Sequence, residues 1–449
     1  MTKKQSQENA NNRVVIVGGG WAGLSAAIEL GRHDIPVILL ESAKQLGGRA
    51  RSVQIDSLDV DNGQHMLLGA YESTLDLLRR IGVNEIDVFE RQPLSLQWLR
   101  PNGTPVSLRT PGLPAPLHLV WALLNAKGLN FRDRLSALKF CRFLQKTNFT
   151  LNTDCNVELL LKENHQSSEL IKAIWEPLCL GALNTQIHEA SAQLFVRTLG
   201  ESFNHSRKDS DILLTRKNLG SIFPEPASDY IETHQGSIRL GQRVTKINIS
   251  NNKVTGVNLL EQKIDSRFVV LATPSTITNN LIEDTDSLLD ISSHLKTIQH
   301  RPICTVYLQY PENTEIDGWL RGSLDTTSQW IFDRRLYGQN GLISVVISGE
   351  GEHMNWDNNE LSDVVEKELA NHFPHWPKPS SKNVIREKRA TFASTVDVNQ
   401  YRPNTQTPVN GLWLAGDYTH NGLPGTLEGA VRSGLQCAQQ IINKQRINS

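Results

Sequence analysis

The first fifty residues alternate between short apolar runs and a helical pattern. Val14–Val17 is an unbroken apolar run, which is typical of a buried parallel strand. Between residues 24 and 30, apolar side chains recur on one side of a helix, and Val37–Leu40 is a second apolar run. The order strand, helix, strand predicts a βαβ unit and therefore an α/β fold with a parallel sheet.

The rest of the chain mixes helical and strand patterns. Amphipathic spacing predicts a helix at residues 71–82, and alternation on both sides of Asn102-Gly103 predicts a β-hairpin. Residues 130–220 are predicted to be mostly helical. Further strands are predicted at residues 243–249, 254–260, 268–273, 301–309, 342–348 and 411–415, and further helices at 361–373 and from residue 427 onwards.

Residues 117–124 (LHLVWALL) form an apolar run directly after a cluster of prolines. The run is too short to cross a bilayer. Packing into the core is the default interpretation. The alternative is a surface that dips into a membrane, or the mouth of an apolar substrate channel. The pattern leaves both open.

Three glycines with the spacing GxGxxG follow the first strand. Gly18 permits the tight turn, Gly20 lets a pyrophosphate approach the backbone, and Gly23 lets the helix pack closely on the strand. Free backbone N–H groups at the start of the helix stabilise the negative charge of a bound phosphate. Glu41 ends the second strand, near the spacing that places a carboxylate on a ribose hydroxyl. This order of elements predicts a dinucleotide site and not merely glycine turns.

Composition narrows the functional classes only a little. The 449 residues allow two or three domains, and a net charge of −1 with a pI near 6.9 gives no reason to expect nucleic-acid binding. Residues 1–12 are polar, resemble neither a signal peptide nor an anchor, and are expected to be disordered. The five cysteines are scattered, so we expect reduced thiols in a cytoplasmic protein, without disulfides or a metal site.

Two further segments point to the same cofactor chemistry. Gly47-Gly48-Arg49 can form a second loop whose arginine reaches phosphate oxygens. Near the C-terminus an apolar strand ends at Gly416-Asp417, and Pro424-Gly425-Thr426 opens a helix. Asp417 can accept a hydrogen bond from a ribityl hydroxyl, and the helix start can stabilise negative charge on a reduced flavin ring. A nicotinamide-only enzyme would not need these segments.

Together these motifs resemble the flavin amine oxidase and phytoene desaturase superfamily, whose cofactor is FAD. Within it, the chain is similar to the hydroxysqualene dehydroxylases, also described as squalene-associated FAD-dependent desaturases, from residue 13 to about residue 440. The narrower likeness is carried by residues 61–69 (DNGQHMLLG), 181–185 (GALNT), 386–392 (REKRATF) and 422–434 (GLPGTLEGAVRSG), with Gly425 standing where a larger residue is expected. The resemblance implies that a strand at Val244 contacts the adenine of FAD. The full set of residues that it implies as FAD contacts is Gly18, Gly20, Trp21, Ala22, Gly23, Glu41, Gly48, Arg49, Gly63, Gln64, Val244, Gly416, Asp417, Thr426, Leu427 and Glu428.

The resemblance also implies a chain divided discontinuously between two domains. A Rossmann-like α/β FAD-binding domain would comprise residues 13–90, 226–295 and 406–449. An inserted substrate domain of mixed α+β structure would comprise residues 91–225 and 296–405.

The family reaction would convert hydroxysqualene, an allylic alcohol, into squalene for hopanoid and squalene biosynthesis. It needs a hydride from reduced FAD, an acid for the departing hydroxyl, and a long apolar slot. His65 is the candidate acid because its loop is expected near the flavin and its ordinary pKa allows either protonation state. Alternatively, His65 only hydrogen-bonds the flavin or the backbone. Asp61 and Arg389 are weaker candidates, and Arg389 is expected instead to pair with Glu387 on a surface strand.

Other functions stay open at this point. A carotenoid-type or phytoene-type desaturase would transfer hydride in the opposite direction, and an amine oxidase would need a polar pocket with an aromatic cage. A prenyl-binding escort protein would use the same architecture without redox work. The electron donor is unknown: Gly349-x-Gly351 lacks a third glycine and is expected to be a turn, so a partner or a free reductant is expected to reduce the flavin. The solubility of the substrate favours a peripheral location on the inner face of a membrane.

Overall fold

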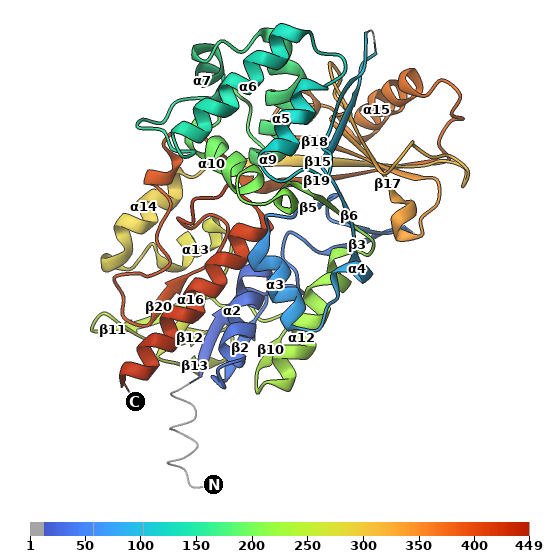
Figure 1. The fold of residues 1–449 in the computed structure, drawn as a ribbon. Helices are drawn as coiled ribbons and strands as arrows, with labels where there is room; N and C mark the ends of the chain where they lie inside the picture. Colours follow the sequence, from blue (N-terminus) through green and yellow to red (C-terminus); the bar gives the residue numbers. More distant parts are fainter. Residues whose placement is uncertain (1–12, 57, 102, 449) are drawn as a thin grey trace.

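The computed structural model describes residues 13–448 except 57 and 102, so the tail expected to be disordered, residues 1–12, lies outside the described residues. A five-stranded parallel sheet with the order β10-β2-β1-β14-β20 lies in the half of the molecule that holds the C-terminus (Figure 1). Its strands are β1 (Val14–Val17), β2 (Val37–Leu40), β10 (Ser237–Arg239), β14 (Phe268–Leu271) and β20 (Leu412–Leu414). Four separate parts of the chain therefore build one sheet.

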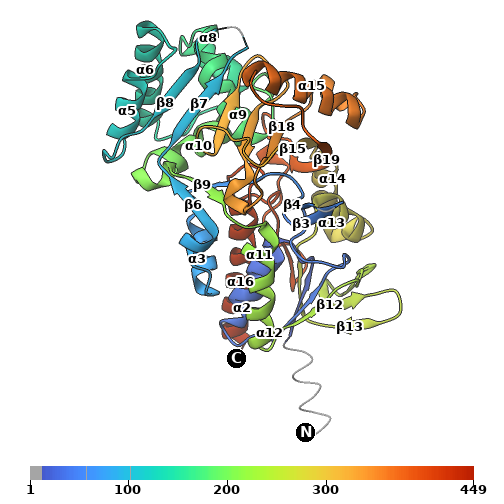
Figure 2. The same cartoon turned by 90° about the vertical axis from the view of Figure 1, so that its right-hand side faces the viewer.

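Both faces of this sheet are covered, which explains the unbroken apolar runs. Helices α2 (Trp21–Gly31), α12 (Pro224–Thr233) and α16 (Leu427–Asn448) cover one face, where Val14 and Ile16 are buried (Figure 2). Val15 and Val17 face the opposite core, with the antiparallel strands β11 (Lys246–Ser250), β12 (Lys253–Asn258) and β13 (Lys263–Asp265). A Cβ at Gly434 of α16 would lie 2.1 Å from the backbone oxygen of Ala22 in α2, so these two helices meet at backbone distance.

A seven-stranded mixed sheet dominates the other half of the molecule, with the order β19-β15-β18-β17-β16-β7-β8. Its strands are β7 (Ser95–Leu99), β8 (Val106–Arg109), β15 (His300–Gln309), β16 (Leu320–Ser323), β17 (Trp330–Asp333), β18 (Leu342–Ser348) and β19 (Ser381–Phe392). Helix α15 (Asn358–His372) packs on one face through Leu361, Val365 and Leu369. Trp98 and Trp330 face the other side, toward a helical layer.

The helical layer consists of α5 (Leu117–Leu124), α6 (Phe131–Lys146), α7 (Val157–Glu163), α8 (Ser168–Leu170), the π-helical turn η1 (Ile171–Trp175), α9 (Glu176–Leu183) and α10 (Ala192–Phe203). Smaller elements join the two halves: β3 (Ser52–Ile55), β4 (Leu58–Asp61), β5 (Met66–Leu68), α3 (Glu72–Arg80), α4 (Glu85–Val88), β6 (Phe89–Gln92), β9 (Ile212–Thr215), α11 (Leu219–Ile222), α13 (Ser275–Ile282) and α14 (Leu289–Thr297). The 3-10 turns are η2 (Arg207–Ser210), η3 (Asp286–Leu288), η4 (Arg334–Tyr337), η5 (Glu352–Met354) and η6 (Val398–Gln400). None of the described helices is long and apolar enough to reach across a bilayer.

Most predicted elements are confirmed, including the pairing of β7 with β8 in the predicted hairpin, although Asn102 of its turn lies outside the described residues. Gly349 is a turn residue with a φ of 76°, as expected. The prediction of helix across residues 130–220 misses β9, which pairs with β5 and β6. Its four residues are all buried, so an apolar run too short for a helix joined a sheet instead.

The proposed domain boundaries agree less well with the elements. The divisions after residues 90, 225 and 295 fall inside β6, α12 and α14, whereas the division after residue 405 falls between β19 and β20. The division into two domains stays a prediction.

Candidate functional site: a cavity between the two halves

The glycine motif forms the start of α2, and each glycine meets a different environment. Gly18 has a φ of 110°, and a Cβ at Gly23 would lie 2.0 Å from the backbone oxygen of Gly18, so both positions require glycine. Gly20 differs from them, because a Cβ there would meet only the Cα of Gly48, at 3.9 Å. No side chain caps the N-terminus of α2. Open space beside an uncapped helix start suits a pyrophosphate.

Glu41 and the second glycine loop close around this helix start. The backbone N–H of Gly47 donates to the backbone oxygen of Gly19 at 2.8 Å. The Glu41 carboxylate accepts hydrogen bonds from the backbone N–H groups of Gly19 (2.6 Å) and Ala43 (2.7 Å). Glu41 therefore orders the glycine loop, and its contact with a ribose stays a prediction.

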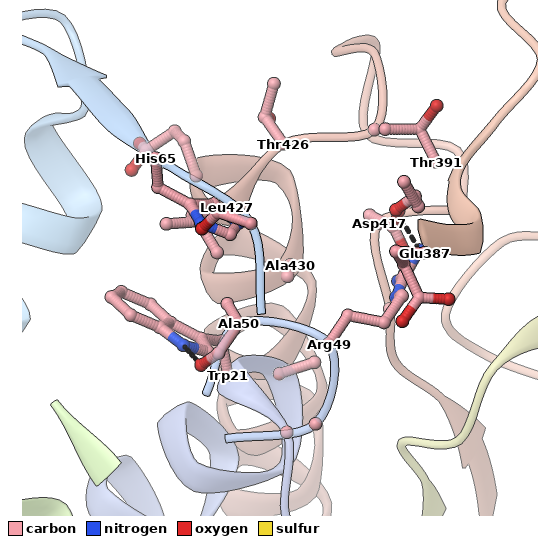
Figure 3. A pocket seen from close by; sticks show the side chains of 18 of the residues that line it. Trp21, Arg49, Ala50, His65, Glu387, Thr391, Asp417, Thr426, Leu427 and Ala430 are labelled. Atoms are coloured by element: carbon pink, nitrogen blue, oxygen red, sulfur yellow. Dashed lines mark hydrogen bonds and ion pairs between the residues drawn. The ribbon is translucent and has the colours of Figure 1, made fainter. Parts of the chain in front are cut away.

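Arg49 and Asp417 bring the two ends of the chain together across the cavity. Arg49 donates to the Asp417 carboxylate at 2.5 Å and to the backbone oxygen of Ala390 at 2.8 Å (Figure 3). Sequence analysis expected Arg49 at a phosphate and Asp417 at a ribityl hydroxyl. Here the two side chains bond to each other, and both expected cofactor contacts stay predictions.

The loop that presents Asp417 is held by a buried arginine that sequence analysis missed. Arg402 donates to the backbone oxygens of Asp417 (3.0 Å), Tyr418 (3.3 Å) and Thr419 (2.6 Å). Its guanidinium lies 4.6 Å from the centre of the Phe392 ring, and burial lowers the pKa of Arg402 to about 10. One planar fork thus fixes three consecutive carbonyl groups.

Replacing Arg402 with lysine is expected to lower the free energy of unfolding by about 1–2 kcal/mol, because one ammonium cannot reach three carbonyl groups. Urea unfolding of the holoenzyme measures this change. Arg389→Lys is the matched control, since the exposed Arg389 side chain makes one hydrogen bond, to Thr276. Equal stability of the two variants would show that the fork is not needed.

The start of α16 lies at the same cavity, as predicted, and two of its side chains cap helices. Thr426 accepts a hydrogen bond from the backbone N–H of Gly429 and so caps the first turn. The Glu428 carboxylate is buried and accepts from the backbone N–H groups of Ser73 and Thr74 and from the Thr74 hydroxyl. Glu428 thereby caps α3, a role that only the docking of α3 on α16 reveals, and its contact with FAD stays a prediction.

The loop between β4 and β5 presents the candidate acid. His65 donates from Nδ1 to the backbone oxygen of Gly63 at 2.7 Å, and its Nε2 bonds to no described residue. Burial lowers the pKa of His65 below its usual value. The neutral imidazole therefore dominates at pH 7, and the acid role stays a prediction that requires the protonated ring.

The weaker acid candidates lie elsewhere. Asp61 is fully buried behind the loop, where burial raises its carboxyl pKa to about 7, and it is not among the residues that line the cavity. Arg389 is exposed and its side chain donates to the Thr276 hydroxyl, while its backbone N–H donates to the Glu387 carboxylate at 3.3 Å. The expected pairing with Glu387 is therefore made by the backbone and not by the guanidinium. Gln64 does line the cavity, and its amide oxygen accepts from the fully buried Arg334 at 2.7 Å.

The two glycine loops, the loop between β4 and β5, the loop at Asp417 and the start of α16 border one cavity of about 820 Å³. Every expected FAD-contact residue except Gly23 lines it, and Gly23 instead closes the turn behind the loop. Val244 lines it from the loop before β11 and not from a strand, which corrects the predicted element. Beyond the glycine loops the walls become apolar, with Leu94, Leu96, Leu178, Leu199, Phe203, Trp330 and Phe332. We call these two parts the cofactor half and the apolar half.

Sequence analysis also missed what Glu387 and Thr391 of β19 do. Glu387 lines the cavity beside Arg49 (Figure 3) and accepts a hydrogen bond from the Asn62 amide at 2.9 Å. The Asn184 amide donates to the Thr391 hydroxyl at 3.0 Å. A Cβ at Gly425 would lie 2.8 Å from the Thr391 Cβ, which explains why a larger residue is absent there. The four passages that carry the narrower family likeness therefore meet at one cavity wall.

All five cysteines are free thiols. Among the described residues, no three His, Cys, Asp or Glu side chains are grouped so that they could hold a metal ion.

The comparisons with known proteins agree with this geometry. Residues 21–442 match the family of flavin containing amine oxidoreductases. The chain belongs to this family. It is 27% identical to a hydroxysqualene dehydroxylase of Zymomonas mobilis over 95% of this chain and 98% of the relative, which confirms the resemblance. It is also 25% identical to a 15-cis-phytoene desaturase of an Oncidium hybrid, over 96% of this chain and 77% of the relative.

Solved structures show the same fold. An oxidoreductase from Methanosarcina mazei superposes with a TM-score of 0.75 at 16% identity, over 95% of this chain and 100% of the other. Cyclohexylamine oxidase from Brevibacterium oxydans gives a TM-score of 0.72 at 15% identity, over 97% and 100%. The α/β FAD-binding fold is thus confirmed.

This flavoprotein is an FAD-dependent oxidoreductase, and the escort alternative is set aside. The residues present fit FAD: Gly20 leaves space beside an uncapped helix, and the cofactor half joins two glycine loops to the start of a second helix. The glycine loops and Glu41 would hold the phosphates and ribose, and the start of α16 would face the flavin ring.

Proposed function

We propose that this oxidoreductase acts on a long apolar isoprenoid, and that its reaction is the reductive dehydroxylation of hydroxysqualene to squalene. One observation carries the proposal. The four passages on which the resemblance to the hydroxysqualene dehydroxylases rests come from distant parts of the sequence. Their residues Asn62, Asn184, Glu387, Thr391 and Gly425 nevertheless meet at one wall of the cavity. Three hydroxysqualene dehydroxylases match this chain over 98% of their own length.

The apolar half of the cavity suits such a substrate. Leucine, phenylalanine and tryptophan side chains form most of its walls. Its acidic residue Glu201 is paired with Arg432 at 3.2 Å, and Arg432 also bonds the Glu428 carboxylate at 2.7 Å. Apolar walls bind an isoprenoid chain by removing its surface from water, and they exclude water from the reacting carbon.

The reaction replaces a C–OH bond by a C–H bond and releases water, so it consumes one hydride and one proton. Reduced FAD, when bound, would supply the hydride. The protein must supply the proton to the departing hydroxyl. His65 and Glu387 are our two candidates for this step. Of the other carboxylates that line the cavity, Asp417 is paired with Arg49, Glu428 caps α3, Glu201 is paired with Arg432, and Glu41 bonds the glycine loop.

Photoreduced holoenzyme incubated anaerobically with hydroxysqualene is expected to form squalene in proportion to the flavin that becomes oxidised. Mass spectrometry identifies the product, and flavin absorbance follows the electrons. The oxidised holoenzyme is the control and is expected to form none. Absence of squalene from the fully reduced enzyme, with hydroxysqualene recovered intact, would refute the dehydroxylation.

A desaturase is the second candidate, because 15-cis-phytoene desaturases match over 96% of this chain. That reaction would remove hydride from the substrate and reduce the flavin. Oxidised holoenzyme with phytoene tests it, since loss of two hydrogens from phytoene together with flavin bleaching would favour this direction of transfer.

A further inference from the structure

Helices α5 and α6 lie at the end of the molecule away from the C-terminus (Figure 1), and large apolar side chains of both helices are exposed. These side chains are Leu117, Val120, Trp121 and Leu124 on α5 and Phe131 and Leu135 on α6. Phe131 is 65% exposed and Leu117 54% exposed. We call these six residues the α5–α6 surface. Soluble monomers rarely expose so many large apolar side chains together.

Helix α5 turns its larger side chains outward. Positions 117, 120, 121 and 124 share one helical face, because residues three and four apart are neighbours. The opposite face carries the buried residues His118, Ala122 and Leu123. The apolar run 117–124 is therefore only partly core, and the default interpretation of its sequence pattern is wrong for half of its residues.

Exposed basic residues lie on α6 beside its part of the α5–α6 surface. Arg132, Lys139, Arg142 and Lys146 are exposed, and at about 100° per residue they fall within the same arc of α6 as Phe131 and Leu135. The one acidic residue between positions 111 and 149 is Asp133, which is buried and accepts hydrogen bonds from Asn130 and Ser167. The whole chain has a net charge of −1, so this positive charge is local.

We propose that the α5–α6 surface docks on an anionic lipid bilayer. The apolar side chains enter the boundary between headgroups and acyl chains, and the basic side chains of α6 contact lipid phosphates. A second copy of the chain fits less well, because two such surfaces would place like charges opposite each other. The same helical layer supplies α9 and α10 to the apolar half of the cavity. Docking does not depend on which isoprenoid the enzyme uses.

Sedimentation of the purified holoenzyme with vesicles tests this docking. Vesicles of phosphatidylcholine alone are compared with vesicles of equal parts phosphatidylcholine and phosphatidylglycerol. We expect binding to the anionic vesicles that weakens as salt is added. Trp121→Asp with Leu124→Asp is expected to lower the partition coefficient at least ~10-fold on both vesicles. Arg142→Glu with Lys146→Glu is expected to lower it ~10-fold or more on anionic vesicles only.

Two matched double variants control for hydrophobicity and charge. Leu260→Asp with Leu289→Asp changes leucines that are 84% and 50% exposed outside this surface. Lys253→Glu with Lys367→Glu makes the same charge change at exposed positions of β12 and α15. Flavin absorbance and the melting temperature show that every variant is folded. The proposal would be overturned if the partition coefficients of the two surface variants equalled those of their control variants. The proposal would also be overturned if the wild-type protein were a dimer that does not bind vesicles and that dissociates when Trp121 is replaced with aspartate.

Discussion

Replacing Gly20 with valine is expected to leave the protein folded and to weaken FAD binding by roughly 100-fold, about 3 kcal/mol. The backbone of Gly20 has a φ of −77° and a ψ of 179°, which valine adopts without strain. A Cβ at this position meets only the Cα of Gly48, at 3.9 Å, which is ordinary van der Waals contact. The added methyl groups would instead occupy the space in which we expect the pyrophosphate to approach the start of α2.

Titration of the FAD-free protein with FAD, followed by flavin fluorescence, measures this affinity. The melting temperature of the FAD-free variant should equal that of the wild type. Gly112→Val makes the same chemical change at an exposed glycine that has no heavy atom within 4 Å of its built Cβ and that does not line the cavity. If Gly20→Val bound FAD with full affinity, the cofactor would have to bind elsewhere. If the variant misfolded, Gly20 would be needed for the fold and not for the ligand.

Replacing His65 with glutamine is expected to slow single-turnover dehydroxylation by about 10²–10⁴-fold and to abolish its pH dependence. Burial lowers the pKa of His65, so the ring is mostly neutral at pH 7 and gains its proton only as the pH falls below 6.5. If the protonated ring delivers the proton, the wild-type rate rises as the pH falls, with a midpoint below 6.5. Glutamine keeps a donor for the Gly63 carbonyl and cannot titrate.

Rapid mixing of reduced holoenzyme with hydroxysqualene across this pH range provides the measurement. Glu387→Gln is the matched variant, because Glu387 is the other candidate acid at the cavity and the amide still accepts from Asn62 through its oxygen. A pH profile that survives in His65→Gln and disappears in Glu387→Gln would transfer the acid role to Glu387. Unchanged flavin absorbance in both variants separates proton delivery from cofactor loss.

The position of Glu387 shows why part of the site escaped prediction. Its segment, REKRATF, has the charge pattern of a solvated strand, and nothing in its sequence says that one of these charges faces a cavity. In the structure β19 pairs with β15 at the edge of the seven-stranded sheet, and Glu387 bonds to Asn62, which is 325 residues away. Arg402 is a similar case, because its three carbonyl partners lie on a loop whose path depends on packing.

What the sequence determined by itself is the βαβ unit with its glycines, the C-terminal strand and helix, and through them the cofactor class. These features depend on contacts between near neighbours, so residue spacing alone reveals them. Only the tertiary structure decided that Arg49 meets Asp417, that Glu428 caps α3, and that α5 turns its larger side chains to the outside. Those outcomes depend on which elements dock together, and docking is set by the burial of surfaces from distant segments, which leaves no periodic trace in the chain.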